Sequence, residues 1–596
     1  MEVVLRLSPA LRRTWFAARG AARWGLRAAL CAGLGWSVQA QTVSPDAGSI
    51  QRDIERQLPT RPPPVPSRPL VVPEQAPKPD ELQFQIKGFV LQGVTLVPLE
   101  EAQSVLKPWL GRPIQFSDLD QAKQAIVDLY QRRGWFARPL IPEQELQDDS
   151  ELRIEVIEGK LGAVRIEGKA TTPEAERRID PERVLKTFTA RQQAGAPLYM
   201  PHIERATSLL NDLPGTSVNV TLASGEDPEA TDVVVSLQPR DLVTATVSRD
   251  NTGSRSTGAV KDTVAMNLDS PYGWGDQTSL NLMRSKGVEY GRLAYTLPVG
   301  YDGWRVGVNA SAMNYHVIFP MSDSNPSYPR GVAYTQGMSL SSALLRSAQH
   351  NLNLQIAYDQ KHFVNEIFNP DTAFINSLSD KRVGVSSLSL TGDHSDDWME
   401  GGVTQWSVGA LGGRVDLSAN TQNFQQDQQG PQTQGVYNKL NLSLSRLQRL
   451  STTQSLWLSL QRQMANRNLD SSEKFTLGGS QGVRAYPSAE GTGDHGWLFT
   501  MESRQVVSPQ WQWVAFIDYG QIRVNHENYV GYNGPDNVDL KGAGLSASYS
   551  VPGVAVARLT WSRRMGENPL ANAKTGLDTD GSFIKHRLWL TVSGFF

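Results

Sequence analysis

Cysteine, net charge and long apolar runs are all scarce in this chain of 596 residues. Its single cysteine, Cys31, lies in an N-terminal stretch with the pattern of a cleaved signal, which excludes disulfide and thiolate chemistry from the mature protein. Because 58 Lys and Arg residues balance 60 Asp and Glu residues, no basic field points to nucleic acid. The mean hydropathy is negative, which argues against a helical membrane protein.

The N-terminus has the pattern of a secretory signal. A region with several arginines is followed by an uncharged stretch, 28–38, and then by the small-residue site Val38-Gln39-Ala40. The apolar core of about eleven residues is too short for a spanning helix, which needs roughly twenty. We therefore expect residues 1–40 to be a signal peptide cleaved near Ala40, with a retained anchor as the alternative.

The first mature segment, 41–58, is expected to contain a short amphipathic helix. A Ser-Pro-Asp sequence can start it, and Ile50, Ile54 and Leu58 recur every four residues among charged side chains. A helix this short is not stable alone, so it either frays or docks its apolar stripe elsewhere in the protein; a disordered leader is the alternative. Prolines crowd the next residues, 59–82, and predict an extended linker that reaches roughly 60 Å.

Two copies of one α+β unit follow the linker. Residues 83–160 have the order strand, helix, helix, strand, strand, and residues 161–239 repeat it. In the first copy, a helix over 98–110 precedes a longer one over 116–133, for which Ser117 is the expected cap. Each copy carries a small sheet whose open edge can accept an extended peptide; inert spacer domains are the alternative.

From residue 240 to residue 596 the helical period disappears and alternating segments follow one another. Leu352, Leu354 and Ile356, for example, alternate with polar residues. An apolar face opposite a face rich in Asn, Gln, Ser and Arg indicates a transmembrane β-barrel with a polar lumen; a soluble sandwich is the alternative. At about ten residues per tilted strand, plus turns and loops, this region allows roughly sixteen antiparallel strands. The expected fold class is thus mainly β, with an α+β part ahead of the barrel.

The last strand is the most specific sign of a barrel. One of its faces carries Leu588, Leu590, Val592 and Phe596, whereas the other carries basic and hydroxyl side chains. Such a strand would close the last open edge of the barrel, which lipid does not tolerate unpaired.

A glycine-rich segment and a later strand supply a candidate contact inside the barrel. The segment contains Val483, Arg484, Ala485 and Tyr486. About thirty residues later, one strand face carries Phe516, Asp518 and Gly520. Asp518 must face the lumen, because a carboxylate facing lipid would be costly. There it invites a charge-assisted hydrogen bond from Arg484.

These motifs resemble those of the two-partner secretion transporters, an outer-membrane family that exports haemolysins, adhesins and contact-dependent inhibition toxins. The resemblance covers nearly the whole mature chain and implies a plug helix (41–58), two POTRA domains (83–160 and 161–239) and a sixteen-stranded barrel (240–596). In this family a long extracellular loop enters the lumen, where its Val-Arg-Gly-Tyr tip binds a Phe-x-Asp-x-Gly strand. Here Ala485 replaces the tip glycine, and an alanine would be strained if that position needed a positive φ.

The resemblance also implies a mechanism and a location. Periplasmic POTRA domains capture an unfolded β-helical exoprotein, which leaves through the barrel in the outer membrane once the plug helix has moved away. The implied partners are a secreted haemolysin, adhesin or toxin, outer-membrane lipid, and the barrel-assembly machinery that inserts the barrel. The transporter is expected to be a monomer that binds no nucleic acid and no cofactor. The sequence contains no phosphate-binding loop, so no nucleotide is expected to drive export.

Other functions have weaker support. Gly478-Gly479-Ser480-Gln481-Gly482 matches a hydrolase motif, but a helix is not expected after it, so we predict no catalytic residues and no enzyme. The eight histidines lack zinc-ligand spacing, so no metal site is expected. The runner-up is a barrel-assembly insertase of the same superfamily, although those factors generally carry more POTRA domains and no plug helix. A simple porin is a third class, and the periplasmic domains count against it.

Overall fold

The computed structural model describes residues 45–58, 84–144, 150–167, 178–319, 327–572 and 574–596. The expected signal peptide (1–40) and Pro-rich linker (59–82) lie outside these residues. Across the described ranges, no helix is both long enough and apolar enough to cross a bilayer.

A short helix, α2 (Ala47–Gln57), forms near the start of the described chain. The Asp46 side chain caps it by accepting a hydrogen bond from the backbone N–H of Ser49 at 2.8 Å. The helix predicted from the four-residue spacing is therefore present. Its stripe is docked rather than frayed, because Ile50 and Ile54 are each only 9% exposed.

The first α+β unit has the predicted order of elements. Its sheet, in the order β2-β1-β4-β3, consists of β1 (Phe84–Gln92), β2 (Pro113–Ile114), β3 (Ala137–Leu140) and β4 (Ser150–Glu158). Against it pack α3 (Leu99–Ser104), the 3-10 turn η1 (Lys107–Trp109) and α4 (Phe116–Arg132). These helices and the sheet enclose an apolar core of their own.

Two details of this unit differ from the sequence prediction. The helix expected over 98–110 ends at Ser104, because the ring of Pro108 would collide with the Ser104 carbonyl of a continuing helix. The cap of α4 is Gln115 rather than Ser117. The backbone N–H of Gln115 donates to the Asp118 carboxylate at 2.9 Å, which holds the first turn.

The second unit repeats the arrangement with a three-stranded sheet in the order β5-β7-β6. Its elements are β5 (Lys160–Ile166), α6 (Pro181–Thr189), α7 (Met200–Asn211), β6 (Thr216–Ser224) and β7 (Ala230–Pro239). Residues of both helices and the sheet form a second, separate apolar core.

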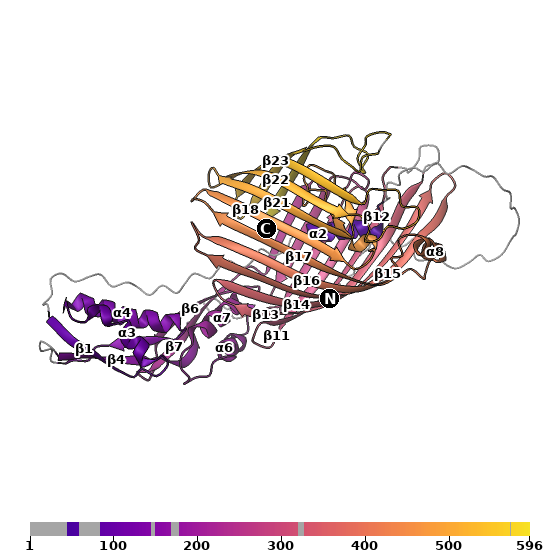
Figure 1. Ribbon diagram of the computed structural model, residues 1–596. Helices are drawn as coiled ribbons and strands as arrows, with labels where there is room; N and C mark the ends of the chain where they lie inside the picture. Colours follow the sequence, from indigo (N-terminus) through magenta and orange to yellow (C-terminus); the bar gives the residue numbers. More distant parts are fainter. Residues whose placement is uncertain (1–44, 59–83, 145–149, 168–177, 320–326, 573) are drawn as a thin grey trace. The chain divides into compact units, whose positions relative to one another are not determined.

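Sixteen strands close into an antiparallel barrel, as the alternating pattern predicted (Figure 1). They are β8 (Val243–Asp250), β9 (Lys261–Asp269), β10 (Gln277–Arg284), β11 (Val288–Val299), β12 (Trp304–His316), β13 (Tyr328–Arg346), β14 (His350–Asn369), β15 (Phe374–Asp396), β16 (Gly402–Asp416), β17 (Gly435–Arg449), β18 (Gln454–Ala465), β21 (His495–Val506), β22 (Trp511–Arg523), β23 (Asn537–Val551), β24 (Ala555–Arg564) and β25 (His586–Phe595). The sheet closes where β25 pairs with β8.

The closing strand β25 has the two faces expected of it. Leu588, Leu590 and Val592 point outward and are 54%, 45% and 45% exposed. Phe596, just after the strand, is 80% exposed. Trp589 has the opposite parity, points inward and is only 7% exposed.

Two segments lie inside the barrel. One is α2, which lies among the barrel strands in Figure 1. The other is the segment 466–494 between β18 and β21, hereafter the inserted loop, which contains the 3-10 turn η2 (Ser471–Glu473) and the short strands β19 (Phe475–Thr476) and β20 (Thr492–Gly493). Both segments bond to the inner wall, as described below.

Candidate functional site

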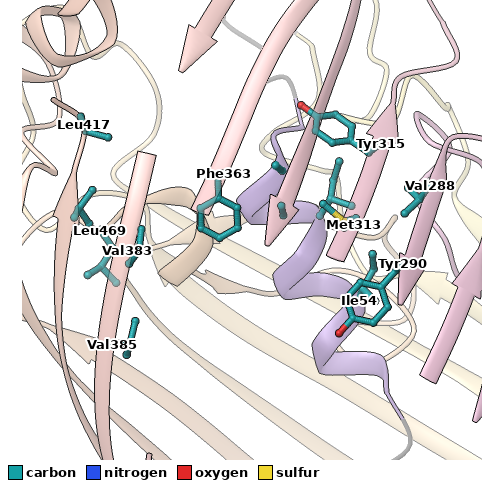
Figure 2. Packing of buried hydrophobic residues seen from close by; sticks show 14 of the residues in the cluster. Ile54, Val288, Tyr290, Met313, Tyr315, Phe363, Val383, Val385, Leu417 and Leu469 are labelled. Atoms are coloured by element: carbon teal, nitrogen blue, oxygen red, sulfur yellow. The ribbon is translucent and has the colours of Figure 1, made fainter. Parts of the chain in front are cut away.

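The apolar stripe of α2 packs against the inner wall of the barrel (Figure 2). Ile50 and Ile54 belong to one buried cluster with wall residues of β11, β12 and β14, namely Tyr290, Met313, Tyr315 and Phe363. Leu58 packs at the edge of this cluster and is partly buried. All three residues of the predicted stripe therefore face the wall.

Polar contacts fix the helix along and around its axis. The backbone N–H of Ala47 donates to Asn365 Oδ1 at 2.8 Å on β14. Gln51 Nε2 donates to Thr335 Oγ1 at 2.8 Å and to Ser311 Oγ at 3.2 Å. Because each partner comes from a different strand, the helix is held in one register on the wall.

Lys381 of β15 joins the helix to the inserted loop. Its ammonium lies 2.9 Å from the Asp46 carboxylate and 2.8 Å from the Asp470 carboxylate, and it donates to Ser471 Oγ at 2.9 Å. The lysine side chain is only 5% exposed. Removing either carboxylate would therefore weaken the compensation of a buried charge, which makes this cluster costly to break.

The helix also contacts the inserted loop directly. Arg52 Nη1 donates to the Ser471 carbonyl at 2.6 Å, and Arg56 donates to the carbonyls of Thr476 and Gln481 at 2.9 and 3.0 Å. At Gly48 a Cβ atom would lie 2.9 Å from Ser472 Cβ, so only glycine allows this approach. Helix and loop thus fill the lumen as one bonded unit.

The tip of the inserted loop is bound to β22 through Arg484. Its Nε and Nη2 donate to the two Asp518 carboxylate oxygens at 2.9 and 2.7 Å, and its backbone N–H donates to the same carboxylate at 3.1 Å. Its guanidinium also lies 3.4 Å from the centroid of the Phe516 ring. Asp518 faces the lumen, as its parity predicted, and the expected hydrogen bond from Arg484 is present.

The rest of the tip is buried against the wall. Val483 and Tyr486 are fully buried in a cluster with residues of β21, β22 and β23. At Gly520 a Cβ atom would lie 2.5 Å from Leu477 Cδ2, so the glycine of the β22 motif leaves room for the loop. Within the loop, the backbone N–H of Val483 donates to the Leu477 carbonyl at 2.7 Å and closes the turn.

Ala485 is accommodated without a strained backbone. It is fully buried, and it is not among the described residues with positive φ, so the concern about a missing glycine does not apply. Its methyl group occupies space left by Gly542 of β23, where a Cβ atom would lie 2.6 Å from Ala485 Cβ. The alanine at the tip is thus matched by a glycine on the wall.

Several partners of the tip were missed from the sequence. Glu502 of β21 accepts from Arg484 Nη1 at 2.8 Å. The Arg484 carbonyl accepts from Ser562 Oγ at 2.7 Å and from Trp589 Nε1 at 2.8 Å. Ser562 lies on β24 and Trp589 on β25, whereas Asp518 lies on β22, so the tip is held by strands on both sides of β23. For Trp589, the alternation along the last strand places the side chain on the lumen side.

The hydrolase-like glycine motif does not form a nucleophile elbow. Its five residues, 478–482, lie in turns of the inserted loop, and turns rather than a helix follow them. Gly482 is required for a different reason, because a Cβ atom there would lie 1.8 Å from the Leu477 carbonyl. The motif serves the fold of the loop.

Comparisons with known proteins agree with this architecture. The family model described as haemolysin secretion/activation protein ShlB/FhaC/HecB matches residues 229–549, and the model of the ShlB-type POTRA domain matches residues 84–159. The heme/hemopexin transporter protein HuxB of Haemophilus influenzae is 22% identical over 92% of this chain and 94% of its own. The outer membrane transporter CdiB of Dickeya dadantii is 26% identical over 69% of this chain and 71% of its own.

Solved structures share the fold over nearly the whole chain. CdiB from Escherichia coli superposes with a TM-score of 0.64 at 20% identity, covering 92% of this chain and 95% of its own. This likeness extends to the barrel and to the α+β units that precede it.

Proposed function

This chain belongs to the haemolysin secretion/activation protein family ShlB/FhaC/HecB, and we propose that it exports a single class of large exoprotein through the lumen of its barrel. It is an outer-membrane transporter of two-partner secretion, with a transmembrane barrel and periplasmic POTRA domains. Members of the family are transporters rather than enzymes. The insertase alternative has no better support from these relatives.

In the proposed mechanism, POTRA domains at 83–160 and 161–239 hold the unfolded partner in the periplasm. The partner, a haemolysin, adhesin or toxin of β-helical type, then displaces α2 and passes through the barrel of residues 240–596. Arg484 and Asp518 keep the inserted loop seated in the wall, while the linker over 59–82 allows the plug to leave. The barrel works as a monomer in outer-membrane lipid, after insertion by the barrel-assembly machinery.

The observation that carries the proposal is the occupied lumen. Helix α2 and the inserted loop both occupy it, and each combines a small apolar contact with buried polar bonds to the wall, such as Gln51 with Thr335 and Arg484 with Asp518. A pore closed by a short helix on a long tether is suited to opening for a polypeptide. A permanent core would instead be packed with apolar side chains throughout.

The experiment compares the secreted proteins of a host that lacks this chain with those of the same host complemented by variants. We expect one large protein to disappear from the medium and to return with the wild-type chain. Arg484→Ala should restore it poorly although the barrel inserts, because Asp518 is left buried without its cation. Arg563→Ala, which removes an exposed arginine from the outer face of β24, is the matched control.

Two further results discriminate the classes. If the chain were an insertase, its loss would lower the amounts of many outer-membrane barrels while no single exoprotein disappeared. A reducible bis-methanethiosulfonate cross-link between Gln51→Cys and Thr335→Cys should tether the plug to β13, since the mature chain is expected to contain no other cysteine. Export should stop when the cross-linker is added and resume with reductant; export that continues with the tether closed contradicts the role of α2 as a plug.

A further inference from the structure

A polar groove interrupts the outer face of the barrel on β13, β14 and β15. The groove has a volume of about 390 Å³ and is lined by Tyr334, Gln336, Gln360, His362 and Arg382. Their outward direction follows from alternation, because the neighbouring Thr335, Phe363 and Lys381 face the lumen, where they contact or surround the plug. Polar side chains that face outward on a barrel need water or the polar group of a ligand as a partner.

The groove lies at the outer end of the apolar band. Strand β8 starts directly after the periplasmic units, so β14, the seventh barrel strand, also starts at the periplasmic side, with His350. His362 follows twelve residues later, which at about 3.3 Å per residue and a tilt of about 40° places it roughly 30 Å above that end. The apolar band of such barrels is about 25 Å tall, so the groove faces the headgroups of the outer leaflet.

Exposed apolar side chains continue directly below the groove. On these three strands they include Met338, Leu340, Ile356, Tyr358 and Leu388. The groove and this apolar surface therefore form one continuous strip, polar at the top and apolar beneath. A lipid has the same division between its headgroup and its acyl chains.

One arginine lines the groove, and a second lies beside it on the next strand. Arg382 is exposed, and among the described residues its guanidinium has no hydrogen bond or ion pair. Arg414 is also exposed and lies on β16 directly opposite Gly384, where a Cβ atom would lie 3.1 Å from the Tyr358 hydroxyl. Asp416 of β16 lies directly opposite Arg382 of β15, but the two side chains form no ion pair within the described chain.

The carboxylates nearby are already engaged. Asp380 lies 2.8 Å from His362 Nε2 and pairs with that imidazole. Asp416 accepts a hydrogen bond from the backbone N–H of Ser418 at 3.0 Å. Within the described residues neither Arg382 nor Arg414 forms an ion pair, so both guanidinium groups are available to a ligand.

We propose that this groove binds the phosphorylated headgroup of an outer-leaflet lipid. The planar guanidinium fork of Arg382 pairs with phosphate oxygens, as does that of Arg414 across Gly384, and the Tyr334 hydroxyl and the Gln360 amide donate beside them. The acyl chains of the same lipid cover the apolar strip below. A soluble phosphate would gain the polar contacts but not this apolar burial, which favours a lipid.

The experiment uses the purified full-length mature protein and counts bound lipid by native mass spectrometry. The probe is lipid A carrying two phosphates, with lipid A stripped of phosphate and inorganic phosphate as comparisons. We expect the wild-type protein to retain the doubly phosphorylated lipid, and Arg382→Gln/Arg414→Gln to bind it roughly tenfold more weakly. Arg563→Gln, on the outer face of β24, is the matched control and should bind like the wild type.

A second variant guards against a general loss of structure. Gly384→Leu keeps both arginines but places a bulky side chain between them, and it should weaken lipid binding while the barrel keeps its heat-resistant electrophoretic mobility. Equal binding by the wild type and the double variant overturns the proposal. Equal binding of phosphorylated and dephosphorylated lipid A also overturns it, because the phosphate would then not be recognised. Displacement of the lipid by millimolar inorganic phosphate overturns it as well, because the acyl chains would then add nothing to binding.

Discussion

Moving one methyl group from the tip of the inserted loop to the barrel wall tests whether close packing between the two holds the loop in place. In Gly542→Ala the new Cβ atom would lie 2.6 Å from Ala485 Cβ. Carbon atoms in contact normally lie about 3.5–4.0 Å apart, so the overlap is about 1 Å. Neither atom can rotate away, because each is fixed to the backbone.

The overlap must be relieved by moving the loop or the strand. Overpacking of this kind costs about 1–3 kcal/mol, and β23 is held by ladders on both sides, so the loop is expected to move. Ala485→Gly removes the conflicting methyl but adds backbone freedom to the loop, at a cost of about 0.5–1 kcal/mol. The double variant Gly542→Ala/Ala485→Gly places the methyl on the wall and should recover much of the wild-type stability.

The assay is single-channel recording in planar bilayers, together with the amount of exoprotein in the medium. We expect Gly542→Ala to raise the fraction of time in open states and to lower export, Ala485→Gly to have a small effect, and the double variant to lie close to wild type. Gly291→Ala on β11 is the control, because its new Cβ atom would meet only Leu282 Cδ2, at 3.5 Å. If the double variant is as impaired as Gly542→Ala, the two sites are not coupled and the packing argument fails.

Three other predictions address the plug, the tip and the first α+β unit. Trp589→Phe keeps an aromatic ring but removes the indole N–H that donates to the Arg484 carbonyl, and should raise channel noise without preventing insertion. Lys381→Met leaves two carboxylates facing each other and should cost about 3–5 kcal/mol of plug binding, seen as frequent openings of the channel; unchanged conductance would contradict this. Burial alone would raise the pKa of Glu158, but hydrogen bonds from Thr95, Leu96 and Tyr130 outweigh it and hold the pKa below its ordinary value. The stabilisation by the carboxylate is thus present at neutral pH and lost as the pH falls through that lowered pKa, so hydrogen exchange of β4 in Glu158→Gln should exceed wild type at pH 7 and converge with it below pH 4.5.

Patterns within a few residues of one another were predicted well. Alternation identified the barrel, the outward face of β25 and the inward direction of Asp518, because side-chain parity is a local property of a strand. The four-residue spacing identified α2 for the same reason. The difference at residues 98–110 is also local, because Pro108 ends the helix four residues earlier, at Ser104.

Contacts between distant elements were not readable in the same way. Parity places Trp589 in the lumen, but it does not say that its indole reaches the carbonyl of Arg484, which is 105 residues earlier in the chain. Likewise, nothing near Lys381 in the sequence indicates that it bonds to Asp46 and Asp470 together. Which inward residues meet depends on the register of many strands and on the path of the inserted loop.

Ala485, which stands where the family motif has glycine, shows why the motif alone describes the contact between the loop tip and the wall incompletely. Viewed along the sequence, Ala485 is a departure from the glycine of the family and suggests strain. In three dimensions the relevant quantity is the space between the tip and β23, and Gly542 leaves that space to the methyl group of Ala485 because it lacks a Cβ atom. The steric requirement therefore belongs to the pair of positions, and we expect the methyl group to be tolerated on either member but not on both.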